Sequence, residues 1–287
     1  MMKIRRYISG LLIIAAFFSC SQNKGAPNHK NELSEPNAAD SASNSLISIR
    51  YIVDSLTDSA AFRHYDEKYS VEQKEIIAAL NRLTPSRIKT GKIIILPDTV
   101  YSDIMPYSPF PWHLDDCDSI SKLILICKRI QAFGAYENGR LVRWGPTSTG
   151  RKKAITPSGL FHTNYKAKLK ISTVNGSWRM PWYFNISNRG GIGLHQYDLP
   201  GYPASHSCIR LFQKDAFWIF NWADAWLLNA DETLIVKKGT PVIIFGTYDY
   251  ESAPPWKALV DNKDILYLTG EELKILQEYI SKINTGN

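Results

Sequence analysis

Residues 191–210, GIGLHQYDLPGYPASHSCIR, place a histidine, a Gly/Pro-rich loop and a cysteine in one short segment. Cys208 begins an apolar stretch directly after the loop, where a side chain can be held rigidly and still be reached from solvent. A thiol becomes a good nucleophile only when a neighbouring base or cation produces its thiolate. His195 and His206 are the candidate bases, and Arg210 is the neighbouring cation.

Three interpretations of Cys208 compete. A cysteine of the hydrophobic core would not by itself require two histidines and an arginine nearby. A zinc site needs four ligands, or three ligands and a water molecule, and the spacing from His195 to His206 to Cys208 is not a common metal pattern. A cysteine nucleophile with a histidine base accounts for the whole group, so no metal and no cofactor is expected.

The same segment resembles the signature of the L,D-transpeptidase catalytic domain, the YkuD family, in which a histidine is followed by a loop and then by S/T-H-G-C. The resemblance covers roughly residues 121–248, because LVRWGPTSTGRKKAITPSGLFHT, residues 141–163, is similar to the first part of the family pattern. It implies a mainly β, sandwich-like fold with one main helix. That fold is expected beside a small α/β N-terminal module and a C-terminal helix.

The resemblance also implies roles for individual residues. Cys208 is expected to be the nucleophile that accepts the acyl group, and His195 the base that takes its proton. His206 and the backbone at Ser207 are expected to help hold the oxyanion, while Arg210 orients the loop or binds a substrate carboxylate. Further expected residues of the site are Ser205, Gly193, Trp182 and Tyr183, the last two lining the groove or else packing in the core.

Two positions depart from the family pattern. The glycine that normally precedes the cysteine is Ser207, and the glycine that normally follows the first histidine is Gln196. If position 207 needs a positive φ, serine is strained there by about 1 to 3 kcal/mol. A degenerate member of the family that binds the cell wall without turnover is therefore one alternative.

The N-terminus has the pattern of an export signal. MMKIRRYISGLLIIAAFFSC has a basic start and an apolar run that is short for a membrane span, and it ends at Cys20. It resembles a bacterial lipoprotein signal, which implies a signal peptide over residues 1–19, acylation of Cys20 and a membrane-anchored, periplasmic protein. An ordinary signal peptide is the alternative. Residues 20–49 are polar and predict a disordered tether.

The rest of the chain divides by pattern. A capping box at Ser70 and Gln73 begins one predicted helix, and a second at Thr269 and Glu272 begins the last. A hairpin is predicted around the turn at 137–139, a helix over 214–228 and a hairpin over 233–248. The expected segments are a module over 50–98 that weakly resembles LysM or is a plain α/β extension, a connector over 99–120, the catalytic domain over 121–250 and a C-terminal extension over 251–287.

Charge and composition limit the partners. The net charge of +7 includes three cations of the signal, and no Lys/Arg block with interleaved aromatics appears, so no nucleic-acid binding is expected. Cys117 and Cys127 either pair as a disulfide or remain thiols. The expected function is a peptidoglycan L,D-transpeptidase that forms an acyl-enzyme on a stem tetrapeptide, releases D-Ala and cross-links to an amine. An L,D-carboxypeptidase or hydrolase with the same nucleophile is the nearest alternative.

Overall fold

A computed structural model describes residues 49–286 of the chain. The α-helices are α1 (Ser59–Lys68), α2 (Val71–Leu80), α3 (Gln213–Trp222) and α4 (Gly270–Thr285). The 3₁₀ helices are η1 (Pro85–Arg87), η2 (Met105–Tyr107), η3 (Asp115–Cys117) and η4 (Pro255–Val260). The strands are β1 (Tyr51–Leu56), β2 (Lys92–Pro97), β3 (Leu123–Cys127), β4 (Ala132–Glu137), β5 (Arg140–Ser148), β6 (Gly159–His162), β7 (Lys166–Ile171), β8 (Arg179–Ser187), β9 (Ile192–Gln196), β10 (Ile209–Leu211), β11 (Leu227–Leu228), β12 (Ile235–Lys237) and β13 (Pro241–Phe245).

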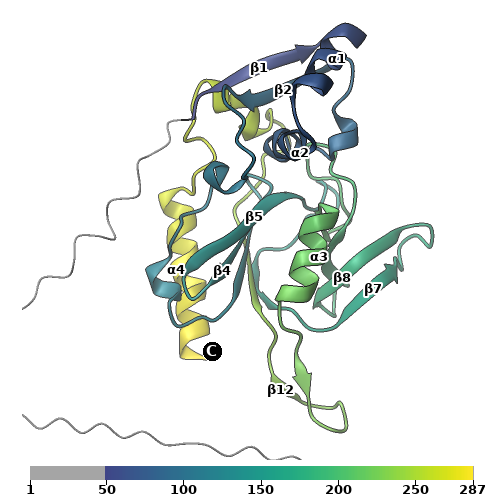
Figure 1. Ribbon diagram of the computed structural model, residues 1–287. Helices are drawn as coiled ribbons and strands as arrows, with labels where there is room; N and C mark the ends of the chain where they lie inside the picture. Colours follow the sequence, from purple (N-terminus) through teal and green to yellow (C-terminus); the bar gives the residue numbers. More distant parts are fainter. Residues whose placement is uncertain (1–48, 287) are drawn as a thin grey trace, which may run out of the picture. The chain divides into compact units, whose positions relative to one another are not determined.

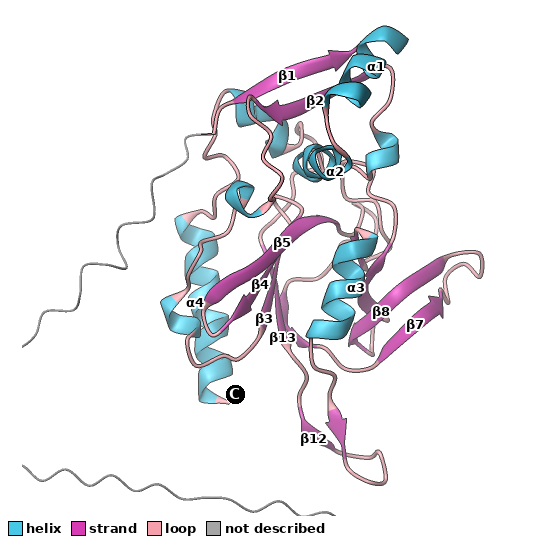
Figure 2. Ribbon diagram, viewed as in Figure 1, coloured by secondary structure: helices cyan, strands magenta, loops and turns pink. Residues whose placement is uncertain are grey.

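A nine-stranded sheet forms the centre of the fold, in the order β6-β13-β3-β4-β5-β10-β9-β8-β7. The pairs β13–β3 and β10–β9 are parallel, and the other neighbours are antiparallel. Figures 1 and 2 show the sheet turning, so that β7 and β8 lie apart from β3, β4 and β13, with α3 beside them. The expectation of a mainly β fold is confirmed.

The sheet buries apolar side chains on both faces. In the continuous apolar strand β3, Leu123 and Leu125 point to one core, and Ile124 and Ile126 to the other, as the two-residue period of a strand requires. The core around Ile124 also receives side chains from β8, β9, β10 and α3, so the two ends of the sheet face each other across it. The core around Leu123 is covered by α4.

The N-terminal module consists of the antiparallel pair β1–β2 and the helices α1 and α2 (Figure 1). The capping box at Ser70 is present, and so is the one at Thr269 that begins α4. The core of the module contains Ile77 and Ile94, and it also includes Leu199 and Phe212 from the segments that flank Cys208. The module therefore packs directly on the segment that contains Cys208. Its resemblance to LysM stays a prediction.

Two local predictions are wrong. The helix predicted over 214–228 ends at Trp222, because Ala223 is extended and residues 227–228 pair with β12. The hairpin predicted over 233–248 does not form, since β12 pairs with β11 while β13 pairs with β3 and β6. Gly239 lies between the two strands, where an added Cβ would be only 1.9 Å from the carbonyl oxygen of Thr163. This close backbone approach directs the chain into the central sheet.

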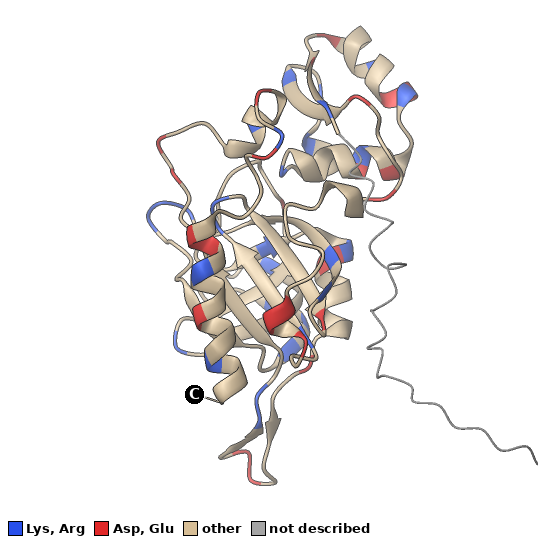
Figure 3. Cartoon of the chain, turned by 90° about the vertical axis from the view of Figure 1, so that its left-hand side faces the viewer, with Lys and Arg blue, Asp and Glu red and all other residues tan. Residues whose placement is uncertain are grey.

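Cys117, Cys127 and Cys208 are free thiols in the structure, so the possible Cys117–Cys127 disulfide is absent from the described residues. Among residues 49–286, none of the helices combines the length and the hydropathy of a membrane span. The predicted signal peptide, Cys20 and nearly all of the predicted tether lie outside the described residues. Figure 3 shows basic and acidic residues interspersed along the drawn chain, for example on α4.

Candidate active site

The parallel pairing of β9 with β10 brings His195 and Cys208 to the same place. Arg210 lies opposite His195 in the register, and Cys208 is the residue that immediately precedes β10. Both side chains line a cavity of about 450 Å³, which also receives Ser205, His206 and Arg210. Side chains between residues 165 and 180 line it too, together with residues 188–191. We call this space the Cys208 cavity.

His195 is held as a neutral base. Its ring is only 4 % exposed, and Nδ1 lies 2.9 Å from the carbonyl oxygen of Gln196, so Nδ1 carries the proton and donates it. Burial lowers the pKa of His195 to about 4, and the nearby Arg210 cation adds to this effect. Nε2 is therefore unprotonated at neutral pH and is available to accept a proton.

Cys208 is a thiol at rest. Burial raises its pKa above the ordinary value, although the Gly193 backbone N–H and the cations of Lys170 and Arg210 oppose the rise. Its Sγ lies 3.7 Å from the carbonyl oxygen of Gly191 and donates a weak hydrogen bond to it. The site therefore holds a neutral thiol and a neutral imidazole in the absence of a ligand.

Ser207 has a φ of +79°, which lies in the left-handed region. Its Oγ is 3.1 Å from the carbonyl oxygen of Ala154 and 3.3 Å from that of Ile155, and it donates to them. Thr156 Oγ1 in turn donates to the carbonyl oxygen of Ser207 at 2.9 Å. Residues 154–156 thus hold the backbone just before Cys208 in a conformation that normally favours glycine.

Arg210 orients the loop between His195 and Cys208. Its guanidinium donates to the carbonyl oxygens of Asp198 at 3.3 Å and Ala204 at 3.1 Å, near the two ends of the loop. It also stacks 4.5 Å from the centre of the Tyr197 ring. Because Arg210 also lines the Cys208 cavity, it can in addition face an anionic group of a substrate.

His206 and Ser205 lie on the Cys208 side of the cavity. The His206 ring packs 4.6 Å from that of Trp178 and contacts Arg151 through Nε2. Burial and the Arg151 cation lower the pKa of His206, which favours its neutral form. Ser205 Oγ donates to the carbonyl oxygen of Cys208 and so fixes the turn that ends at the thiol.

Of the remaining predicted residues, Tyr183 and Gly193 do not line the Cys208 cavity, and Tyr183 packs in the core beside it. The Tyr183 hydroxyl donates to the carbonyl oxygen of Gly191 at 3.1 Å. Gly193 lies against the Tyr183 ring, and a Cβ at Gly193 would come within 2.6 Å of that ring. Trp182 does not line the Cys208 cavity. It has a φ of +53° and contributes to a second cavity instead.

The sequence did not indicate several residues of the cavity. Lys170 and Trp178 come from the β7–β8 hairpin, and Arg189 comes from the turn between β8 and β9. Asn185 is buried, donates to the Tyr183 hydroxyl at 2.8 Å and leaves its Oδ1 without a partner among the described residues. β8 was not predicted, and no local motif marks these positions. Within residues 49–286, no group of three or more His, Cys, Asp and Glu side chains is arranged to hold a metal ion.

Comparison with protein families matches residues 122–244 to YkuD, the L,D-transpeptidase catalytic domain. Residues 122–244 are a YkuD domain. Both His195 and Cys208 lie within residues 122–244.

Solved structures similar to this chain include three L,D-transpeptidases. One from Mycobacterium smegmatis is 20 % identical, with 44 % of this chain and 59 % of that chain covered and a TM-score of 0.35. L,D-transpeptidase 1 from Mycobacterium tuberculosis is 21 % identical, with coverages of 44 % and 62 % and a TM-score of 0.34. The one from Stackebrandtia nassauensis is 16 % identical, with coverages of 62 % and 93 % and a TM-score of 0.37.

These similarities are limited in extent. This chain spans about three fifths of the length of the mycobacterial proteins that it matches. A search of the curated proteins found no match. The assignment of the YkuD domain therefore rests on the match over residues 122–244.

The N-terminal module holds one end of the active-site loop of the YkuD domain. Arg87 binds the carboxylate of Asp198 through both Nε and Nη2. The Thr84 N–H donates to the carbonyl oxygen of Leu199 at 2.8 Å, and Thr84 Oγ1 accepts from the Leu199 N–H at 2.8 Å. Residues outside the YkuD domain thus fix the backbone three to four positions after His195.

Proposed function

We propose that this chain is a cysteine-dependent L,D-transpeptidase that acts on peptidoglycan stem tetrapeptides. The observation that carries the proposal is the pair of His195 and Cys208 in one cavity, the first with an unprotonated Nε2 and the second with a half-buried thiol. Such a pair suits acyl transfer, since the imidazole can remove the thiol proton as the sulfur attacks a carbonyl.

The proposed reaction has two half-steps. His195 Nε2 takes the proton from Cys208, whose sulfur attacks the carbonyl carbon of the third, L-centred residue of the stem. The tetrahedral intermediate collapses to a thioester, and the D-Ala amine leaves with the proton returned by His195. An amine of a second stem then attacks the thioester, gives up a proton to His195 and releases Cys208 as a thiol.

Charge near the thiol supports an anionic peptide as the substrate. Lys170, Arg189 and Arg210 all line the Cys208 cavity, and a stem peptide presents carboxylates that such cations bind. We assign the contact to the oxyanion to backbone N–H groups at Ser207 and Cys208, with His206 beside them. A single donor of this kind is worth about 3 kcal/mol in the transition state.

We also propose that the protein works outside the cytoplasmic membrane, anchored in the periplasm by a lipid on Cys20. The support is the sequence of residues 1–20 and the substrate itself, because the wall polymer lies outside that membrane.

The test is the intact mass of the protein after incubation with a carbapenem, and then with a disaccharide that carries a tetrapeptide. A covalent adduct is expected on the wild type and on Cys117→Ala, which removes a buried thiol that does not line the cavity, but not on Cys208→Ala. The released products then show whether an amine or water resolves the thioester. A cross-linked product indicates an amine acceptor and a transpeptidase, and a free carboxylic acid indicates water and a carboxypeptidase. A folded wild type that forms no adduct would refute the proposal and favour a wall-binding protein without turnover.

A further inference from the structure

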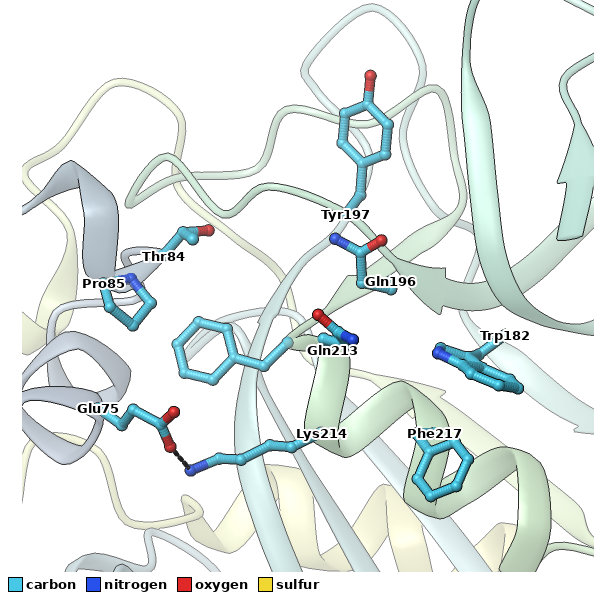
Figure 4. Close-up of a pocket in the computed structure, with 10 residues that line it drawn as sticks. Glu75, Thr84, Pro85, Trp182, Gln196, Tyr197, Gln213, Lys214 and Phe217 are labelled. Carbon is cyan, nitrogen blue, oxygen red and sulfur yellow. Dashed lines mark hydrogen bonds and ion pairs between the residues drawn. The ribbon is translucent and has the colours of Figure 1, made fainter. Parts of the chain in front are cut away.

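A second cavity of about 610 Å³ lies where the N-terminal module meets the YkuD domain (Figure 4). Glu75 and Thr84 belong to the module, while Trp182, Gln196 and Gln213 belong to the YkuD domain. We call this space the Gln213 cavity. The proposed chemistry at Cys208 does not use the side-chain amides of Gln196 and Gln213.

The Gln213 cavity adjoins the active site. His195 and Gln196 are successive residues of β9, so their side chains point to opposite faces of the strand. His195 lines the Cys208 cavity and Gln196 lines the Gln213 cavity, while Tyr197 lines both. The two cavities therefore lie on opposite sides of β9 and adjoin at Tyr197, so a polymeric substrate with a peptide branch in the Cys208 cavity reaches the second cavity around this residue.

The lining combines aromatic faces with unused amides. Trp182 and Phe217 meet edge to face with ring centres 4.8 Å apart, and Phe217 is 49 % exposed. The side-chain amides of Gln196 and Gln213 make no hydrogen bond to any described residue, although each can donate two and accept two. Figure 4 shows these amides in the middle of the view, between the Trp182 ring and the Glu75–Lys214 ion pair.

The charges of this cavity cancel. Glu75 and Lys214 pair with each other, and they are the only ionisable Asp, Glu, Lys or Arg side chains among its described lining residues. A carboxylate-bearing peptide finds its cations in the Cys208 cavity instead, at Lys170, Arg189 and Arg210. The Gln213 cavity thus suits an uncharged ligand that has both hydrogen-bonding groups and an apolar face.

We propose that the Gln213 cavity binds an acetamido sugar of the glycan strand to which the stem peptide is attached. A pyranose ring offers a face of C–H groups to Trp182 and Phe217, and its hydroxyl and acetamido groups pair with Gln196 and Gln213. The inference rests on the proposed function, because the glycan is the part of that substrate that does not enter the Cys208 cavity.

The experiment measures binding of chitotetraose, a tetramer of N-acetylglucosamine, to the full chain by titration calorimetry. Gln213→Ala and Phe217→Ala are each expected to raise the dissociation constant about fivefold to tenfold, as the loss of one hydrogen bond or one stacking face implies. Both side chains are exposed and lie outside the Cys208 cavity. Gln277→Ala and Tyr267→Ala, at exposed positions elsewhere, are the matched controls and should bind as the wild type does.

Carbapenem acylation of Cys208 is measured on the same samples, which separates the two proposals. Acylation without chitotetraose binding, or binding that all four variants leave unchanged, would overturn the sugar site and leave the proposed function standing. If Gln213→Ala and Phe217→Ala weaken chitotetraose binding but Cys208 is not acylated in the wild type, the sugar site is supported and the proposed transpeptidase function is refuted. Binding to wall polymer that falls in parallel with chitotetraose binding would further support the site.

Discussion

Substitution of Ser207 by glycine and by alanine tests how the backbone next to the nucleophile is held. A non-glycine residue in the left-handed region costs about 1 to 2 kcal/mol, and Ser207 has a φ of +79°. Glycine removes that strain. It also removes the hydroxyl that donates to the carbonyl oxygens of Ala154 and Ile155, which is worth about 1 kcal/mol net, and it adds about 0.5 to 1 kcal/mol of freedom to the unfolded chain.

These contributions nearly cancel for glycine but not for alanine. We expect Ser207→Gly to change the free energy of unfolding by less than about 1 kcal/mol. Ser207→Ala keeps the strain and loses the hydrogen bonds, so it should lower the free energy of unfolding by about 1 kcal/mol or more. Serine is therefore tolerated where the family pattern has glycine, because its hydroxyl offsets the strain.

The assay is urea unfolding with a constant m-value, so that shifts of the midpoint report stability. Ser86 is the matched control, since it is exposed and does not have a positive φ. There the order should reverse, with glycine less stable than alanine. If Ser207→Gly proves less stable than Ser207→Ala, the left-handed conformation at residue 207 does not decide the energetics and the reasoning is refuted.

Two further predictions concern the buried side chains of His195 and Arg82. Above pH 6.5 His195 is neutral in both the folded and the unfolded chain. Because its folded-state pKa is about 4 against an ordinary 6.5, the unfolded chain binds the proton first as the pH falls, and the free energy of unfolding should drop by about 3 kcal/mol towards pH 4. Urea unfolding at several pH values should show a weaker pH dependence in His195→Gln, and an equal one would contradict the assignment. The buried Arg82 side chain donates hydrogen bonds to the carbonyl oxygens of Ile130, Ala79 and Leu80. Arg82→Ala removes these bonds and should lower the free energy of unfolding by about 3 kcal/mol. Arg50→Ala, at the surface, is the control and should change the free energy of unfolding little. Equal effects of the two arginine variants would show that the buried hydrogen bonds do not matter.

Local sequence signals predicted the elements that depend on local physics. The capping boxes at Ser70 and Thr269 begin α2 and α4, and the turn at 137–139 joins β4 and β5, because caps and tight turns are satisfied by residues close in sequence. The motif around Cys208 likewise indicated which side chains meet in the cavity. For α1 a signal was present but missed, since Asp58 caps the helix by accepting from the N–H groups of Ala60 and Ala61.

Elements that depend on distant partners were not predictable in this way. β12 and β13 read as one hairpin, yet each pairs with a strand from another part of the chain. Trp182 and Tyr183 were predicted to line one groove or to pack in the core. As successive residues of β8 they point to opposite faces, so that Trp182 lines the Gln213 cavity while Tyr183 is buried and donates to the carbonyl oxygen of Gly191. Strand pairing decides which face of the sheet a side chain lies on, and a short sequence pattern does not contain that information.

The reactivity of this site is a property of more than its motif. Desolvation favours the neutral form of both His195 and Cys208, so under the proposed function the proton moves from the thiol to the imidazole as a substrate brings its carbonyl to the sulfur. Their relative positions depend on the intervening loop, which Arg210 holds from the YkuD domain and Arg87 holds from the N-terminal module. Under the proposed function a displacement of about 1 Å can cost a hundredfold in rate, so we expect the contacts of the module with Asp198 and Leu199 to contribute to the geometry of catalysis.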